Sequence, residues 1–125
     1  ERRIERVIRN LVVNAIEHAD GTTVTITLAT TETDVACRVR DRGVGMTQEV
    51  ADHVFDRFYR ADTARARTTG GTGLGLAIAT EDVAIHGGRL QAYGEPGRGA
   101  SFLMTLPKKA GADIVSRPLP LWENE

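Results

Sequence analysis

Apolar residues in the first part of the chain recur with the period of an amphipathic helix. They stand three or four positions apart, at Ile4, Val7, Ile8, Leu11, Val12, Ala15 and Ile16. This spacing predicts a helix over residues 1–19 with one apolar face. No capping residue precedes the pattern, so we expect the chain to begin inside an element, as a fragment of a longer protein would.

Two segments after the turn at Asp20-Gly21 alternate between apolar and polar residues. The apolar positions are Val24, Ile26 and Leu28 in the first segment and Val35, Cys37 and Val39 in the second. Alternation of this kind places every second side chain on one face of a β-strand. We expect two half-buried strands that pair as antiparallel neighbours.

The middle of the chain, residues 43–73, has no clear period apart from a short helical segment at 47–54. A long loop of this kind in a compact domain is usually functional or mobile. A second helix is predicted over residues 74–86, because the apolar run there ends at Gly87-Gly88.

Two further strands, over residues 89–94 and 100–106, complete the pattern. The order of elements predicts an α+β fold: a two-layer sandwich in which helices cover one face of a mostly antiparallel sheet. We expect this domain to span residues 1–106. The pattern disappears beyond Pro107, so residues 107–125 are expected to form a flexible tail that frays.

Composition narrows the class of protein. At 125 residues, with 41% hydrophobic and 26% charged residues, the chain suits one compact soluble domain. A net charge of −1 gives no basic field for nucleic acid, and no apolar run approaches the ~20 residues that span a bilayer. The single Cys37 cannot form an internal disulfide and fits a buried strand position, which favours a reducing compartment.

The first candidate site lies on the opening helix, where Asn10 and Asn14 share a face with Glu17. Carboxamide oxygens are hard ligands that suit Mg²⁺, which takes few protein ligands and completes its shell with water and phosphate. Two solvated surface asparagines are the alternative. Asparagine is a poor helix former, however, so two asparagines in the middle of a helix favour a functional role.

The second candidate site is Asp41-Arg42-Gly43-Val44-Gly45-Met46, at the end of the second strand. Asp41 has the parity of Val39, so its carboxylate should point toward the core. A buried carboxylate needs a donor, and the exocyclic amine of adenine is one. Gly43 and Gly45 would let the backbone approach such a ligand. The alternative is a turn aspartate that caps its own backbone.

The third candidate site is the glycine-rich segment Gly70–Ile78, which leads directly into the second predicted helix. Exposed amides at a helix N-terminus attract phosphate. The spacing matches neither the P-loop nor the dinucleotide-binding fingerprint. Forked donors for phosphate precede it, at Arg57, Arg60, Arg65 and Arg67. A merely flexible, solvated loop is the alternative.

Taken in order, with Phe55–Asp62 between the second and the third, these motifs resemble the N, G1, F and G2 boxes of the histidine kinase catalytic domain. That family belongs to the wider Bergerat (GHKL) ATPases. The resemblance covers residues 1–106. The runs Arg2–Ala19 and Gly94–Gly97 are also similar to actinobacterial sensor kinases of the MtrB type.

The resemblance implies the Bergerat fold and an ATP site in which Asn14 binds Mg²⁺, supported by Asn10, and Asp41 takes the adenine amine. It places Arg60 and Arg65 in a mobile lid near the phosphates. The expected nucleotide site comprises Asn10, Asn14, Glu17, His18, Asp41, Gly43, Gly45, Met46, Arg60, Arg65, Gly71, Thr72, Gly73, Leu74, Gly75 and Leu76.

Two positions depart from the family pattern. Many members have lysine and tyrosine after the Mg²⁺ asparagine, where this chain has Glu17 and His18. The resemblance therefore leaves a phosphate-binding lysine and an adenine-stacking tyrosine without counterparts, although His18 could stack or donate to phosphate.

Asn10 also bears on the reaction. Hydrolysing relatives carry a water-activating glutamate four residues before the Mg²⁺ asparagine, and Asn10 cannot be a general base. We therefore expect positioning and charge neutralisation of the γ-phosphoryl group rather than rapid hydrolysis. None of the histidines, His18, His53 and His86, stands in a phosphoacceptor box. The expected partner is a separate histidine-bearing dimerisation domain, for which Val7–Ile16, Phe55, Phe58 and Tyr59 are the candidate docking surface.

The resemblance also implies a response regulator as an indirect partner and a homodimeric, membrane-anchored parent with this domain in the cytoplasm, the fragment itself being monomeric. Two alternatives stay open: a serine kinase of the anti-sigma-factor type, and a degenerate nucleotide-binding module without activity. The segment Phe55–Asp62 favours the histidine kinase, whereas Glu17 favours the degenerate module.

Overall fold

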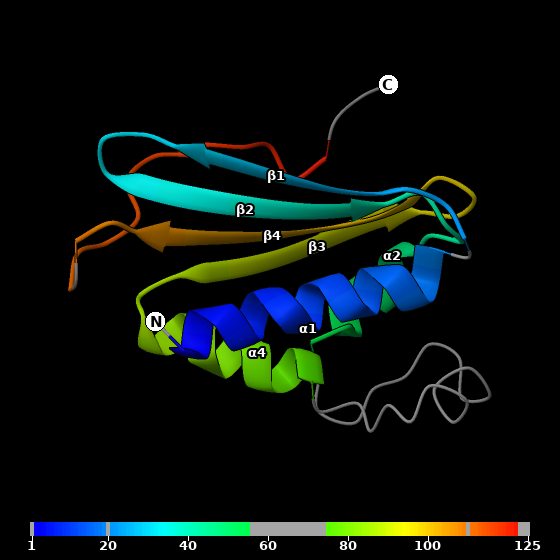
Figure 1. Ribbon diagram of the computed structural model, residues 1–125, viewed down its shortest axis with the longest axis horizontal. Helices are drawn as coiled ribbons and strands as arrows, with labels where there is room; N and C mark the ends of the chain where they lie inside the picture. The colour runs from blue at the N-terminus through cyan, green and yellow to red at the C-terminus, as the bar shows by residue number, and fades with distance from the viewer. Residues whose placement is uncertain (1, 20, 56–74, 110, 123–125) are drawn as a thin grey trace.

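The computed structural model describes residues 2–19, 21–55, 75–109 and 111–122, and it contains the predicted elements in the predicted order (Figure 1). The elements are α1 (Arg2–Ala19), β1 (Val24–Thr30), β2 (Asp34–Asp41), α2 (Gln48–His53), α4 (Gly75–Ile85), β3 (Arg89–Glu95) and β4 (Gly99–Pro107). The predicted helices and strands are therefore confirmed, each to within a few residues.

Local sequence explains where the helices begin and end. The N-cap of α2 is Thr47, whose hydroxyl accepts a hydrogen bond from the Val50 amide at 3.3 Å. After α4 the chain turns at Gly87, which has a φ of 75°, and the Gly88 amide donates to the Val83 carbonyl at 2.9 Å. A left-handed glycine followed by this backward bond is the usual end of a helix.

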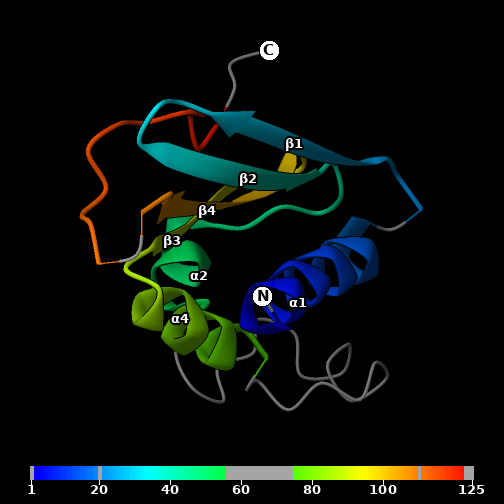
Figure 2. The same cartoon turned by 60° about the vertical axis from the view of Figure 1, so that its left-hand side comes forward.

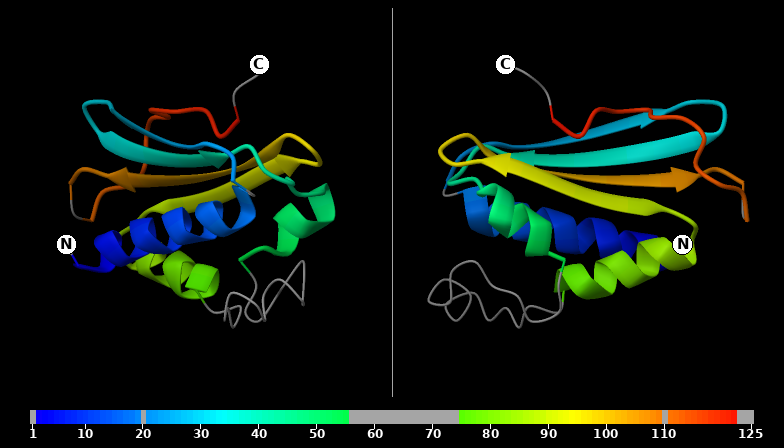
Figure 3. Two further views of the ribbon diagram at one scale, coloured as in Figure 1. Left: turned by 45° about the vertical axis from the view of Figure 1, so that its right-hand side comes forward. Right: turned by 180° about the vertical axis from the view of Figure 1, so that it is seen from behind.

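The sheet has four strands in the order β1-β2-β4-β3, and every neighbouring pair is antiparallel. In the central pair, Asp41 of β2 lies opposite Ala100 of β4. The three helices among the described residues, α1, α2 and α4, lie on one side of the sheet, as Figures 2 and 3 show. This arrangement confirms the α+β sandwich predicted from the sequence.

The core fills the space between the helices and the sheet. Its fully buried members include Val7, Leu11 and Ala15 of α1, Cys37 and Val39 of β2, Ala79 and Val83 of α4, and Phe102 of β4. The ring of Phe55 meets Phe102 edge to face, with 6.0 Å between centroids. At the helical surface, Arg6 of α1 donates to the Asp82 carboxylate of α4 at 2.9 Å, which ties these two helices together.

A third layer covers part of the sheet face that the helices leave open. Residues 111–122, the C-terminal strap, cross this outer face in an extended path (Figure 2). The Asp34 carboxylate accepts hydrogen bonds from the Ser116 hydroxyl at 2.6 Å, the Ser116 amide at 2.8 Å and the Val115 amide at 3.2 Å. The Arg38 guanidinium donates to the Pro120 carbonyl at 2.9 Å.

The strap changes two expectations. The sequence indicated that β2 would be half-buried, but this was wrong because Arg38 and Arg40 on its outer face are also buried. The segment 107–125 was expected to fray. Its motion stays a prediction, but residues 115–122 make the specific contacts described here. The other strand expected to be half-buried, β1, leaves Ile26 and Leu28 exposed, because α1 contacts β2 more extensively than it contacts β1.

Candidate functional site

Asp41 ends β2 with its side chain on the helical side of the sheet, as its parity with Val39 predicted. It is only 1% exposed. Its Oδ1 accepts a hydrogen bond from the Gly43 amide at 3.0 Å, so the turn-capping interpretation is confirmed for this oxygen. Its Oδ2 is buried and has no hydrogen-bond partner among the residues that the structure describes.

A buried carboxylate oxygen without a donor is costly, because the group has lost water and gained nothing in its place. The turn-capping interpretation therefore applies to Oδ1, and the ligand-binding interpretation concerns Oδ2. One oxygen fixes the turn, and the other is left for a donor from outside the described chain. An exocyclic amine of a planar base is such a donor, which fits the ATP-binding interpretation.

The loop after β2 contacts the turn between β3 and β4 through backbone atoms. The Gly97 amide donates to the Val44 carbonyl at 2.9 Å. Gly45 has a φ of 80°, and a Cβ built there would lie 2.0 Å from the Glu95 carbonyl oxygen. At Gly99 a Cβ would lie 2.0 Å from the Asp41 carbonyl oxygen. Both positions require glycine because two backbones meet there.

This contact explains why glycine is required at position 45, and the explanation differs from the expected one. The sequence suggested that Gly45 lets the backbone approach a ligand, whereas the structure shows it approaching the β3–β4 turn. The neighbouring Met46 is buried in the hydrophobic core. Both residues therefore support the Asp41 end of β2, and their contact with nucleotide stays a prediction.

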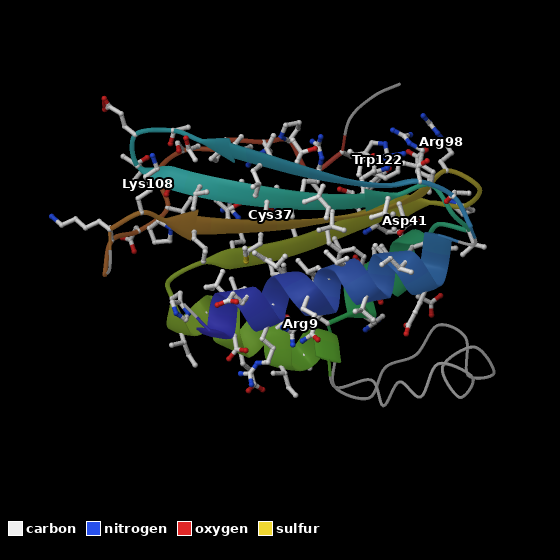
Figure 4. All side chains as sticks on the ribbon, in the orientation of Figure 1. Arg9, Cys37, Asp41, Arg98, Lys108 and Trp122 are labelled. Atoms are coloured by element: carbon white, nitrogen blue, oxygen red, sulfur yellow. The ribbon has the colours of Figure 1, made fainter. Side chains whose placement is uncertain are left out.

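The polar residues of α1 flank its buried stripe. Asn10, Asn14 and Glu17 are half-buried, on the flank of the helix face that buries Leu11 and Ala15. The three side chains therefore lie on one flank of the helix, as their spacing predicted. Figure 4 shows Asp41 at the end of the sheet above the C-terminal part of α1, so the two motifs lie at the same end of the domain. His18 belongs to the last turn of α1.

Only the end of the glycine-rich segment belongs to the described chain. Gly75 and Leu76 form the first residues of α4, whose first turn carries no acidic residue. The positive end of this helix dipole is therefore not offset by a neighbouring carboxylate. Arg60, Arg65, Gly71, Thr72, Gly73 and Leu74 lie outside the described residues.

Among the described residues, no cluster of three or more histidine, cysteine, aspartate or glutamate side chains is suited to a metal ion. No helix among them is long and apolar enough to cross a membrane. Cys37 is a buried free thiol, as expected, and burial raises its pKa.

Sequence reasoning missed Arg40, the residue that precedes Asp41. Its guanidinium lies on the outer face of the sheet, only 5% exposed, and donates to two backbone carbonyls near the candidate site. Alternation along β2 placed Arg40 on a polar face, and no further signal in the sequence distinguished it from a solvated arginine.

Comparisons with known proteins agree with this geometry. The family model described as histidine kinase-, DNA gyrase B-, and HSP90-like ATPase matches residues 1–110. The sensor histidine kinase MtrB of Mycobacterium tuberculosis is 52% identical over 120 residues, which are 96% of this chain and 21% of that protein. The histidine-protein kinase AfsQ2 of Streptomyces coelicolor is 43% identical over 107 residues, which are 86% of this chain and 20% of that protein.

Among solved structures, full-length ShkA in complex with AMPPNP matches with a TM-score of 0.74 and 29% identity. The match covers 88% of this chain and 22% of that one. The chain thus spans about a fifth of the length of the curated relatives it matches. The C-terminal strap begins where the family model ends, and the match to MtrB extends into it, because 120 of 125 residues are covered.

The shared fold, the order of the motifs and the orphaned carboxylate oxygen of Asp41 agree with these matches. The chain belongs to the histidine kinase-, DNA gyrase B- and HSP90-like ATPase family, and within it to the ATP-binding catalytic domains of sensor histidine kinases.

Proposed function

We propose that this domain binds ATP with Mg²⁺ through Asp41 and Asn14, and donates the γ-phosphoryl group to a histidine on a separate dimerisation domain. The observation that carries the proposal is the buried Oδ2 of Asp41, which has no partner among the described residues. The rigid end of β2 holds this acceptor at the edge of the core.

On the adenine side, Oδ2 of Asp41 accepts a hydrogen bond from the exocyclic amine, while Oδ1 keeps its hydrogen bond from the Gly43 amide. The fixed turn means that the acceptor need not reorganise when the base arrives, which favours affinity. Met46, Gly43 and Gly45 shape the support behind it. The solved complex of ShkA with AMPPNP, an ATP analogue, supports a nucleotide at this kind of domain.

On the phosphate side, we assign the metal to Asn14, with Asn10 supporting it and Glu17 and His18 nearby on α1. One carboxamide oxygen suits Mg²⁺, which takes few protein ligands and neutralises charge on the moving phosphoryl group when bound. Arg60, Arg65 and the backbone of Gly71, Thr72, Gly73, Leu74, Gly75 and Leu76 complete the phosphate side of the proposal.

The chemistry proposed is positioning rather than hydrolysis. Asn10 is an amide and cannot take a proton from water, so the domain holds ATP until a histidine reaches the γ-phosphoryl group. The partner is therefore a histidine-bearing domain of the same kinase. We further propose a response regulator as the later acceptor, and a homodimeric, membrane-anchored parent with this domain in the cytoplasm.

Asp41→Asn tests the adenine side. The variant replaces a charge-assisted hydrogen bond and should weaken ADP about 10- to 100-fold. Guanine presents a carbonyl at the corresponding position, so GDP should gain relative to ADP. Calorimetric titrations of both nucleotides measure this, with the exposed Asp52→Asn as the matched control. A folded Asp41→Asn that binds ADP as wild type does would remove Asp41 from the site.

Asn14→Ala tests the metal side. Alanine is the better helix former and introduces no buried charge, so the fold should be retained. ADP affinity without Mg²⁺ should be unchanged, while the increment that Mg²⁺ adds should be lost. Phosphoryl transfer to a separately supplied histidine domain should fall further than binding, by about 100-fold or more.

Glu5→Ala, an exposed change on the same helix outside the candidate docking surface Val7–Ile16, is the control for Asn14→Ala. Equal transfer rates for wild type and a folded Asn14→Ala would contradict the metal assignment. Wild-type protein that binds ADP but never phosphorylates the added domain would support the degenerate nucleotide-binding module instead.

A further inference from the structure

The ring of Trp122, at the end of the C-terminal strap, stacks on the guanidinium of Arg40 directly behind the Asp41 end of β2. The guanidinium carbon of Arg40 lies 3.8 Å from the ring centroid. Tyr93 of β3 meets the same ring edge to face at 4.9 Å between centroids. Figure 4 shows Trp122 above the sheet at the end that carries Asp41 and Arg98. A cation on an aromatic face is attracted more strongly when it is desolvated, as Arg40 is here.

The donors of Arg40 point at the backbone that surrounds Asp41. Its Nε donates to the carbonyl oxygen of Asp41 at 3.3 Å, and its Nη2 donates to the carbonyl oxygen of Arg98 at 3.0 Å. Arg98 belongs to the β3–β4 turn, which is also bonded to the loop after Asp41 through Val44. One guanidinium therefore joins the end of β2 to the turn that packs beside it.

The strap holds Trp122 in place through backbone carbonyls. The Ser101 hydroxyl donates to the Leu121 carbonyl at 2.6 Å, and Arg38 donates to the Pro120 carbonyl. These two anchors come from β4 and β2, the central strands of the sheet. The ring is thus fixed by the two residues that precede it, and the strap reaches Arg40 from outside the part of the chain that the family model matches.

We propose that Arg40 is a positioning residue for Asp41, and that the strap sets adenine affinity and selectivity by holding Arg40 through Trp122. Residues 40 and 41 point to opposite faces of one strand, so the strap acts through the thickness of the sheet and touches no nucleotide. This inference rests on the proposed adenine role of Asp41.

The test compares ADP and GDP affinities of wild type, Trp122→Ala, Trp122→Phe and Arg40→Lys. Trp122→Ala and Arg40→Lys should each weaken ADP about fivefold or more and lower the ADP-to-GDP preference. A role confined to stability would leave that preference unchanged. Trp122→Phe keeps a ring over Arg40 and should stay within about twofold of wild type. Ser116→Ala alters the strap at its far end, beside Asp34, and is the control.

A second readout uses wild-type protein alone. Coupling between two binding events is reciprocal, so ADP must tighten the docking of the strap by the factor by which the strap tightens ADP. Trp122 is the single tryptophan of the chain, and its fluorescence therefore reports the strap without a label. Saturating ADP should lower the quenching of Trp122 by acrylamide. Quenching that ADP leaves unchanged would overturn the proposal, even if a variant failed to fold.

The double variant Asp41→Asn/Trp122→Ala separates this inference from the proposed function. If Trp122 acts through Asp41, its loss should add little once the acceptor is altered, because the two effects share one route. Full additivity contradicts the inference, as does a folded Trp122→Ala with wild-type affinity and preference. If Asp41→Asn leaves ADP affinity and the ADP-to-GDP preference unchanged, the proposed adenine site is wrong, and this inference is wrong with it. If Asp41→Asn changes them but the Trp122 and Arg40 variants do not, only this inference is wrong.

Discussion

The two faces of the sheet are covered in different ways. The inner face meets the helices through apolar side chains such as Val39 and Phe102, and their burial is non-directional. The outer face meets the strap through Asp34, Arg38 and Ser101, which form directional bonds, most of them to strap backbone. We therefore expect the inner face to contribute most of the free energy of unfolding, whereas the outer face fixes the position of the C-terminal strap.

The largest expected effect belongs to the inner face. Phe102→Ala removes a fully buried ring that also meets Phe55, and it should lower the free energy of unfolding by about 3–5 kcal/mol. Urea denaturation followed by circular dichroism measures the change. A loss below about 1 kcal/mol would mean that the inner face does not dominate stability.

A smaller effect is expected on the outer face. Ser116→Ala removes the hydroxyl that donates to Asp34, and it should cost about 0.5–1.5 kcal/mol. The loss should appear as local loosening of the strap beside Asp34, seen as faster amide exchange in residues 112–117, with little change in residues 121–122 and in the sheet. Equal acceleration across β2 and β4 would show that the two faces unfold as one unit.

The smallest effect is a dependence on pH, and it too is confined to the outer face. The Ser116 hydroxyl, followed by the Thr33 hydroxyl and the amides of Ser116 and Val115, holds the pKa of Asp34 below its usual value against the opposing effect of burial. A carboxylate with a lowered folded pKa stabilises the fold fully above its unfolded pKa of about 3.9 and loses that contribution as pH falls further.

The stability difference between wild type and Asp34→Asn should therefore be constant above about pH 5 and shrink below about pH 4. Urea denaturation of both proteins across this range measures it, and the subtraction removes the titration of the other carboxylates. A difference that stays constant into strong acid would show that the strap does not depend on the charge of Asp34.

The elements that form the inner face could be predicted from the sequence, because their buried side chains recur with the period of a helix or a strand. The helix at 2–19 and the four strands followed from spacing alone, and the direction of Asp41 followed from its parity with Val39. For Asp41, the turn-capping interpretation is confirmed for one oxygen. The other oxygen has no partner among the described residues, and its contact with adenine stays a prediction. The roles of Asn14 and the glycine-rich segment stay predictions.

The outer face was not predictable because its contacts leave little trace in side-chain pattern. The strap offers carbonyls at Pro120 and Leu121, and any residue would offer the same group. The sequence assigned Gly45 to a ligand, whereas glycine is required there by the backbone of Glu95, which lies 50 residues further along the chain. Only the three-dimensional contact reveals this reason. The contacts of Arg40 could not be predicted for the same reason, because its hydrogen-bond acceptors are backbone carbonyls.

The strand order also has a consequence for how the chain folds. Strands β1 and β2 form one hairpin and β3 and β4 another, and each closes over a short turn. The two hairpins pair along β2 and β4, where Asp41 lies opposite Ala100, a residue 59 positions later in the sequence. Joining them closes the longest loop in the sheet, and closure entropy grows with loop length. We expect this docking, rather than either hairpin, to limit the folding rate.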